Sequence, residues 1–401
     1  MIVPKLRFSE FKDEWNEKLL SDFTTFSKGK GLSKSDIVKN GKNPCIRYGE
    51  LYTTYGSTIS EAISYTNLDK NNCVLSKKNQ IIIPSSGETQ IDIATASCVL
   101  SDDIILGGDL NILTTNENGI FLAYYLSSAK KNDIAQLAQG NSVVHLYAKE
   151  LATLKINYPS KEEQTKIAEF LSAVDDKISQ LSRQLELLNQ YKKGVMQKIF
   201  SQEIRFKNDN GEDFGEWQTV KLGNYLIKYD KKTTENNQYP VLTSSRNGIF
   251  FQKDYFAGQD VSSSDTTGYN IVPFGYFTYR HMSDDLIFKF NINNICENGI
   301  VSTLYPVFTV DEKYLNSQFL QTILNEGNEF KNFAIMQKQG GSRTYMYFSK
   351  LSELMITIPE LKEQEKIAGF LTAIDERINH TTAQLTHTKQ WKKGLLQQMF
   401  V

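Results

Sequence analysis

The chain repeats itself at a shift of 200 residues. Residues 159–175 read PSKEEQTKIAEFLSAVD, and residues 359–375 read PELKEQEKIAGFLTAID. Further along, Phe200 returns as Phe400. An internal repeat constrains the fold more than composition does, because both copies must be able to adopt one structure. We therefore predict a pseudo-two-fold internal repeat built from two copies of one plan.

The two repeated segments, 159–200 and 359–401, are predicted to be long helices. Their apolar residues recur in alternating steps of four and three, which is the pattern of a coiled-coil seam. Lys192 and Lys392 interrupt the pattern at the same place in each copy. The predicted seam comprises Ile167, Leu171, Val174, Ile178, Leu181, Leu185, Leu188, Ile367, Leu371, Ile374, Ile378, Leu385 and Leu395.

A helix of 40 residues is about 60 Å long and would leave its apolar stripe in water if it stood alone. The stripes can be covered by other chains, or the two helices can pair with each other. We favour an antiparallel pair within the chain, because residues 201–358 can form a globular unit at the far end. Each helix is expected to start just after a proline, and Ser160 with Glu163 suggests a capping box at the first start.

The fold class is predicted as α/β (α+β), with two globular domains, 1–158 and 201–358, joined by the two helices. Each domain ends with a glycine-rich turn, a strand-like piece and a Leu-x-x-Leu-x-Ile segment before the proline. The turns are 139–142 and 339–342, and the strand-like pieces are 143–146 and 344–348. Other predicted strands are 80–84, 103–106, 269–273 and 299–304, and matching short helices are predicted at 117–128 and 311–324.

Size and composition agree with two domains. At 401 residues with 40% apolar side chains, the chain exceeds what one core normally holds. No apolar run is long enough for a membrane span, and the N-terminus lacks the apolar stretch of a signal peptide, so a cytoplasmic protein is expected. The four cysteines are far apart in the sequence, which favours reduced thiols over disulfides or a zinc site.

No catalytic constellation is found. Lys28-Gly29-Lys30-Gly31 lacks the spacing of a phosphate-binding loop and indicates a basic turn. The segment Asn43-Pro44-Cys45-Ile46 is faintly similar to the Asn-Pro-Pro-Tyr/Phe element of adenine methyltransferases, but it lacks the aromatic ring of that element. The four histidines have no paired ligands, so no metal site is predicted, and the pairs at 102–103 and 284–285 are interpreted as turn or cap aspartates.

Binding chemistry is better represented, in the loops of the two domains. Arginine beside tyrosine, serine and glutamine in glycine-bearing loops suits contact with phosphates and base edges. The alternative is that these are ordinary solvated loops, and the net charge of −1 gives no global basic field. Candidate DNA-binding residues are Lys28, Lys30, Arg47, Tyr48, Ser86, Ser245, Arg246, Arg280, His281, Lys338, Arg343 and Tyr345.

The doubled Pro-x-x-x-Glu-Gln-x-x-Ile-Ala-x-x-Leu motif, at 159–171 and 359–371, resembles the specificity subunit of type I restriction-modification systems over the whole chain. The resemblance implies a subunit without catalytic activity, in which each domain is a target recognition domain reading one half of a split DNA site. The helices would set the unread spacer and dock two methyltransferase subunits, and two restriction subunits would complete the complex. S-adenosylmethionine, ATP and magnesium would belong to those partners, and this chain would bind no cofactor.

Two other functions were weighed. A structural scaffold would hold two interaction domains apart and show no sequence-selective DNA binding with any partner. A free-standing methyltransferase or nuclease would need the cofactor loop and catalytic element that the sequence lacks. The pseudo-two-fold repeat favours DNA recognition, with the half-sites about one helical turn, roughly 34 Å, apart.

Overall fold

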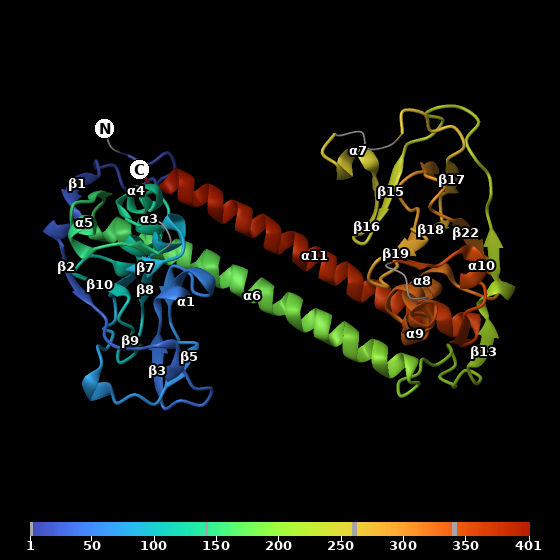
Figure 1. Ribbon diagram of the computed structural model, residues 1–401, viewed down its shortest axis with the longest axis horizontal. Helices are drawn as coiled ribbons and strands as arrows, with labels where there is room; N and C mark the ends of the chain where they lie inside the picture. Colours follow the sequence, from blue (N-terminus) through green and yellow to red (C-terminus); the bar gives the residue numbers. More distant parts are fainter. Residues whose placement is uncertain (1–2, 141–142, 259–262, 339–342) are drawn as a thin grey trace. The chain divides into compact units, whose positions relative to one another are not determined.

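The computed structural model describes residues 3–140, 143–258, 263–338 and 343–401, and the chain divides into two compact units. Unit 1 is Met1–Leu185 with Thr381–Val401, and unit 2 is Glu186–His380. The long helices α6 (Lys161–Phe200) and α11 (Leu361–Met399), drawn in Figure 1, each contribute one part to each unit. Each unit thus takes in part of both helices, in addition to residues of the predicted domains 1–158 and 201–358.

The two helices pair within the chain, and they run antiparallel. In unit 1 the start of α6, at Ile167 and Leu171, shares a core with Leu395 near the end of α11. In unit 2 the end of α6, at Ile199, shares a core with Ile367 at the start of α11. Eight predicted seam residues are buried, namely Ile167, Leu171, Val174, Leu181, Ile367, Leu371, Ile374 and Leu395, and five are half-buried, namely Ile178, Leu185, Leu188, Ile378 and Leu385.

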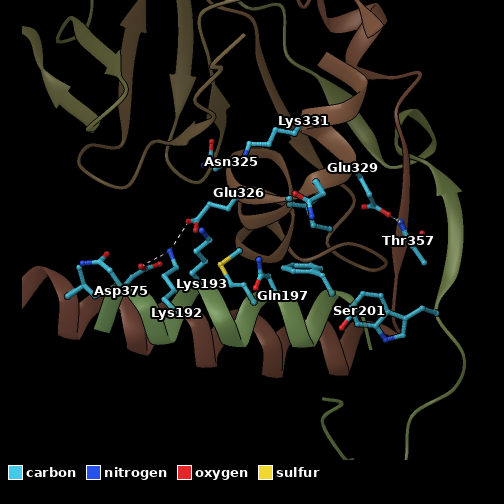
Figure 2. Close-up of a pocket in the computed structure, with 18 residues that line it drawn as sticks. Lys192, Lys193, Gln197, Ser201, Asn325, Glu326, Glu329, Lys331, Thr357 and Asp375 are labelled. Atoms are coloured by element: carbon cyan, nitrogen blue, oxygen red, sulfur yellow. Dashed lines mark hydrogen bonds and ion pairs between the residues drawn. The ribbon is translucent and has the colours of Figure 1, made fainter. Parts of the chain in front are cut away.

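The seam lysines are paired across the two helices. Lys192 of α6 lies 2.8 Å from Asp375 of α11 and 2.7 Å from Glu326 in unit 2 (Figure 2). Lys392 of α11 makes the corresponding pair with Asp175 of α6 in unit 1. Burial opposes the charge on Lys192, but its hydrogen bonds to Asp375 and Glu326 outweigh burial and raise its pKa. A polar residue in an apolar seam favours the one register that gives it a partner.

The Glu-Gln pair of the repeated motif holds each unit together. Glu163 is 1% exposed and accepts two hydrogen bonds of 2.7 Å from Arg7; Glu363 is fully buried and accepts the same two bonds, at 3.0 and 2.7 Å, from Arg205. Ser160 accepts a weak bond of 3.4 Å from the Glu163 amide. The predicted capping box at this start is therefore only half formed, because Arg7 takes the Glu163 carboxylate.

The glutamine of the motif links each long helix to a short one. The Gln164 amide oxygen accepts the Asn118 backbone N–H at 3.1 Å, and that of Gln364 accepts the Asn316 N–H at 2.9 Å. The two asparagines are the N-caps of α3 (Gly119–Ser127) and α8 (Ser317–Glu326). The recurring motif is thus explained by packing within each unit.

Unit 1 is built on a five-stranded sheet ordered β2-β10-β6-β8-β4 and a three-stranded sheet ordered β5-β3-β9, with two-stranded ladders β1-β12 and β7-β11. Its strands are β1 (Asn16–Leu19), β2 (Thr24–Lys28), β3 (Asn43–Ile46), β4 (Thr58–Ile59), β5 (Ser64–Thr66), β6 (Ile81–Pro84), β7 (Ser86–Gly87), β8 (Ser97–Val99), β9 (Ile105–Leu106), β10 (Leu110–Thr115), β11 (Val144–His145) and β12 (Lys155–Tyr158). Its short helices, besides α3, are α1 (Tyr48–Thr53), α2 (Gln90–Ile93), α4 (Lys131–Leu137) and α5 (Ala148–Ala152).

Unit 2 has a four-stranded sheet ordered β14-β22-β18-β20 and the ladders β13-β24, β15-β16, β17-β21 and β19-β23. Its strands are β13 (Gln218–Lys221), β14 (Leu226–Lys228), β15 (Leu242–Ser245), β16 (Gly248–Phe251), β17 (Asn270–Pro273), β18 (Phe277–Thr278), β19 (Met282–Ser283), β20 (Asn291–Ile292), β21 (Asn298–Val301), β22 (Val307–Val310), β23 (Thr344–Tyr345) and β24 (Met355–Ile358). Its other helices are α7 (Gln252–Tyr255), α9 (Asn328–Met336) and α10 (Phe348–Leu351).

The predicted mixed α/β fold is confirmed, with local differences. The strand predicted at 344–348 ends at Tyr345, because Phe348 already begins α10. The predicted turn 339–342 and the second half of the turn 139–142 lie outside the described residues. The ends of the chain lie in unit 1, where the Leu6 N–H donates to the Gln398 carbonyl at 2.9 Å.

Candidate nucleic-acid interface

Each unit carries a short two-stranded ladder at the same position of the repeat. In unit 1, β7 pairs with β11, and in unit 2, β19 pairs with β23. Alternate residues of β11, β23 and the residues flanking them are buried, which turns the intervening side chains outward. We call these outward residues the ladder face: it consists of Val143, His145 and Tyr147 in unit 1, and of Arg343, Tyr345 and Tyr347 in unit 2.

Buried polar side chains fix both ladders from behind. In unit 1 the Asn111 amide donates to the Leu146 carbonyl at 2.9 Å. In unit 2 the Tyr279 hydroxyl donates to the Met346 carbonyl at the same distance, and burial raises the pKa of Tyr279. The ladder face is therefore presented by a backbone that each core holds in place.

Three rings contact one another at the ladder face of unit 2: Tyr345 and Tyr347 belong to the face, and His281 lies beside them. His281 lies 5.0 Å from Tyr347 and 6.0 Å from Tyr345, and the two tyrosines are 5.7 Å apart, measured between ring centroids. Tyr345 is 41% exposed and Tyr347 is 50% exposed. The His281 ring is positioned by a hydrogen bond between its Nδ1 and the Leu304 carbonyl. Aromatic rings that stay exposed are suited to packing against sugars, base methyl groups or base faces.

Two arginines of unit 2 are held by adjacent aspartates. Arg343 Nε lies 2.9 Å from Asp284 Oδ1, and Arg246 Nη2 lies 2.7 Å from Asp285 Oδ1. The hydrogen bond from Arg246, together with that from Ser283, holds the pKa of Asp285 below its usual value. Asp285 also accepts the Ile287 N–H at 3.2 Å, as a turn aspartate does.

The other candidates of unit 2 take different places. Ser245 closes the turn between β15 and β16, because its hydroxyl donates to the Gly248 carbonyl at 3.1 Å and accepts the Asn247 N–H. Arg280 is exposed and precedes His281, and Lys338 is exposed just after α9. The structure thus brings Arg343, Tyr345 and His281 together, with Arg246 on the neighbouring aspartate.

In unit 1 the basic candidates border the segment 107–111. Lys28 and Lys30 are exposed on either side of Gly29, whose N–H donates to the Leu110 carbonyl at 3.1 Å. A Cβ at Gly29 would lie 1.9 Å from the Gly107 carbonyl oxygen, so only glycine fits at this close approach. Ser86 joins the same region through hydrogen-bond distances of 3.3 Å to Asp109 and to the His145 ring.

Arg47 and Tyr48 open α1. Arg47 is half-buried, and its Nε lies 3.2 Å from Glu50, whose carboxylate is buried and also accepts the Ser64 hydroxyl at 2.7 Å. The Tyr48 ring packs beside Tyr52 at 6.5 Å. Arg47 therefore neutralises a buried acid, a role that the loop pattern alone did not indicate.

Sequence reasoning missed Val143, Tyr147 and Tyr347 on the ladder face and the pairing of the aspartates with arginines. The tyrosines could have been found, because Tyr147 and Tyr347 are identical at the repeat shift of 200. The ion pairs could not have been found from the sequence, because Asp284 and Arg343, for example, are 59 residues apart in the chain.

Unit 2 also contains a cavity of about 650 Å³ beside the last turns of α6 (Figure 2). Trp217, Phe200 and Met196 give it apolar walls, while Lys193 and Glu329 add charge. Burial raises the pKa of Glu329, although hydrogen bonds from Thr357 lower it in part. The ladder face does not line this cavity.

Within the described residues, no group of three or more His, Cys, Asp or Glu side chains could hold a metal ion. Over the same residues, no helix combines the length and apolar character needed to cross a membrane. The four cysteines are free: Cys45 and Cys98 are buried, and Cys73 and Cys296 are half-buried.

Two α/β units built on a pair of long antiparallel helices, each with a two-stranded ladder at the same place, define a protein with a pseudo-two-fold repeat. The family of the type I restriction modification DNA specificity domain matches residues 12–190 and 212–387, and the chain belongs to this family.

Curated relatives agree. The chain is 23% identical to the type I restriction enzyme MjaVIII specificity subunit of Methanocaldococcus jannaschii, over 96% of this chain and 91% of the relative. It is 20% identical to the putative type I specificity subunit S.MgeORF438P of Mycoplasma genitalium, over 100% and 97%. The crystal structure of a type I restriction-modification S subunit from M. genitalium shares the fold, with a TM-score of 0.66 at 14% identity over 100% of this chain and 99% of that one.

Proposed function

We propose that this chain is the non-catalytic DNA-recognition subunit of a type I restriction-modification complex, in which each unit reads one half of a bipartite, asymmetric site. One observation carries the proposal: the same ladder occurs in both units with different outward side chains. Val143 and His145 in unit 1 stand where Arg343 and Tyr345 stand in unit 2. A common scaffold with different outward groups is what reading two different half-sites requires.

The proposed DNA has to be bound largely with help from partners. The net charge is −1, and the arginines Arg246 and Arg343 are paired with aspartates. Because phosphate contacts dominate affinity, the chain alone should bind DNA weakly and with a small salt dependence. Two methyltransferase subunits would supply further phosphate contacts, and two restriction subunits would complete the nuclease. S-adenosylmethionine, ATP and magnesium would be bound by those subunits.

The long helices are proposed to set the spacer and to dock the methyltransferase subunits. Exposed apolar residues on their outer surfaces support docking: Leu187 and Tyr191 on α6 are 47% and 52% exposed, and Trp391 on α11 is 48% exposed. Tyr191 and Trp391 occupy equivalent positions of the repeat, as two copies of one partner would need.

The decisive experiment is methylome sequencing of a host that expresses this chain with its methyltransferase partner. We expect one bipartite motif with methylated adenines in both halves. Replacing residues 201–358 with the corresponding part of another specificity subunit should change one half and leave the other. A motif that stays the same, or that changes in both halves, contradicts the proposal that each unit reads one half of the site.

The spacer role is tested by shortening the helices. Deleting one heptad from each helix removes about 10 Å of paired helix at 1.5 Å per residue. We expect a shorter spacer or a loss of methylation, with both half-sites unchanged. A variant that still assembles and methylates the original spacer would refute the proposal that the helices act as a ruler.

A further inference from the structure

We propose that Arg343 of unit 2 reads a guanine in its half-site and that Asp284 is the positioning residue that aims it. The inference rests on the proposed function, because it concerns how unit 2 recognises DNA.

The first step is the geometry of the ion pair. An arginine side chain has five N–H donors in a planar fork. Among the residues that the structure describes, Asp284 accepts from Nε of Arg343 at 2.9 Å, and no hydrogen bond occupies the two terminal nitrogens of the fork, which leaves them for another ligand. Guanine presents two acceptors, O6 and N7, in the major groove, and a two-pronged arginine matches them. Arg246 differs, because Asp285 engages one of its terminal nitrogens, Nη2.

The second step is where the pair is placed. Arg343 is on the ladder face, directly before Thr344, which pairs with Ser283 across the ladder. The Arg343 side chain is 51% exposed, and Tyr345 lies two residues along on the same face. Asp284 follows Ser283, so the ladder itself fixes the aspartate beside the arginine.

The negative charges beside Arg343 affect which part of the DNA it can contact. Asp284 and Asp285 put two carboxylates beside the arginines, and carboxylates repel phosphate groups. A phosphate contact would therefore be weakened at this place. Base edges carry no net charge, so an arginine held by an aspartate can still bond to guanine there. The pair thus favours base reading over backbone contact.

The fourth step is the comparison with unit 1. There Val143 occupies the place of Arg343, and Glu88 follows Gly87 as Asp284 follows Ser283. Val143 is 52% exposed and has no hydrogen-bonding group in its side chain. Unit 1 cannot make the same contact with its side chain, so the two half-sites should differ at the base pair read here.

The test uses the complex of the full chain with its methyltransferase partner and duplexes carrying the motif found by methylome sequencing. Each guanine of the half-site assigned to unit 2 is replaced in turn by 7-deazaguanine, which lacks N7. For the wild-type chain, one replacement should weaken binding about 10- to 100-fold. The Arg343→Ala variant should bind the natural site more weakly than the wild-type chain does. That one replacement should no longer change its affinity, whereas the replacements at the other guanines should still weaken binding.

Three further variants sharpen the result. Arg343→Lys keeps the charge but not the fork, so it should lose the same discrimination. Asp284→Asn should reduce discrimination at that position and increase binding to unrelated DNA. Lys338→Ala gives the reference for loss of one surface charge, with uniform weakening on all duplexes. Unchanged thermal unfolding and unchanged assembly with the partner verify that each variant is folded.

Uniform weakening by Arg343→Ala on every duplex would show a phosphate contact and overturn the inference. The inference would also be overturned if Arg343→Ala and Asp284→Asn both discriminated guanine from 7-deazaguanine as the wild-type chain does, while exchange of residues 201–358 still changed one half-site. In that case the proposed function stands without this contact. If the exchange changes neither half-site, the proposed function fails and the inference fails with it.

Discussion

Replacing Arg205 with methionine should destabilise unit 2 far more than an ordinary surface change. Arg205 donates to both oxygens of Glu363, at 3.0 and 2.7 Å, and to the Gly215 carbonyl at 2.7 Å. The Glu363 side chain is fully buried, whereas the Arg205 side chain is 23% exposed. Methionine keeps the aliphatic part of the side chain and leaves a buried carboxylate without its cation.

The magnitude follows from that burial. Removing one partner of a buried ion pair costs about 3–5 kcal/mol. Because water reaches part of Arg205, we expect the lower end of that range or slightly less, roughly 2–3 kcal/mol. For a unit of this size, each kcal/mol lowers the melting temperature by about 2–4 °C, so the shift should be roughly 4–12 °C.

The assay is urea unfolding followed by the fluorescence of Trp217, whose ring contacts Phe200 and Phe319 in unit 2. Trp15 and Trp391 both lie in unit 1, and they are replaced by phenylalanine in every variant so that only unit 2 reports. The free energy of unfolding is compared with and without the Arg205→Met change.

Two controls belong to this experiment. Lys366→Met breaks an exposed pair with Asp209, whose side chain is 88% exposed, and should change the free energy of unfolding little. The double variant Arg205→Met, Glu363→Met removes both charges and should recover most of the loss, since apolar replacements of a buried pair are often neutral or stabilising. Equal midpoints for Arg205→Met and Lys366→Met would refute the explanation of the Glu-Gln motif by packing.

Three more predictions concern stability. Lys192→Met should lower the urea midpoint of unit 2, because it leaves Asp375 and Glu326 without the cation that pairs with both, and the register of the seam would be less strictly set. Glu329→Gln should stabilise unit 2 at pH 8 but not at pH 4. Burial raises the pKa of Glu329 in the folded state, so the wild-type chain loses stability as the pH rises through the pKa that Glu329 has in the unfolded state. Urea midpoints at the two pH values measure this difference. Val143→Arg should change the free energy of unfolding of unit 1 by no more than about 0.5 kcal/mol, because Val143 is exposed. The same substitution at the neighbouring Val144, which is 3% exposed, should lower the free energy of unfolding by roughly 3 kcal/mol or more.

The sequence predicted those features whose signals are local. The seam of α6 and α11 follows from residues three and four apart, and its antiparallel pairing was favoured because residues 201–358 can form a globular unit at the far end. The Arg7–Glu163 pair joins residues 156 apart in the chain, and no local pattern marks such a pair. Arg47 stays a predicted DNA contact, but its pair with Glu50 was not predicted, because the burial of Glu50 is decided by the packing of the whole unit.

The two copies differ where the structure permits change at low cost. Glu363 and Gln364 are buried and fully hydrogen-bonded, so altering either leaves unpaired groups that each cost about 1–3 kcal/mol. The ladder face is exposed and is held from behind by its backbone carbonyls, through Asn111 in unit 1 and Tyr279 in unit 2. Its side chains therefore contribute little to folding and can be exchanged without loss of the scaffold. The proposed reading of two different half-sites on one fold needs this separation, and the repeat places both kinds of position at the same sites in each unit.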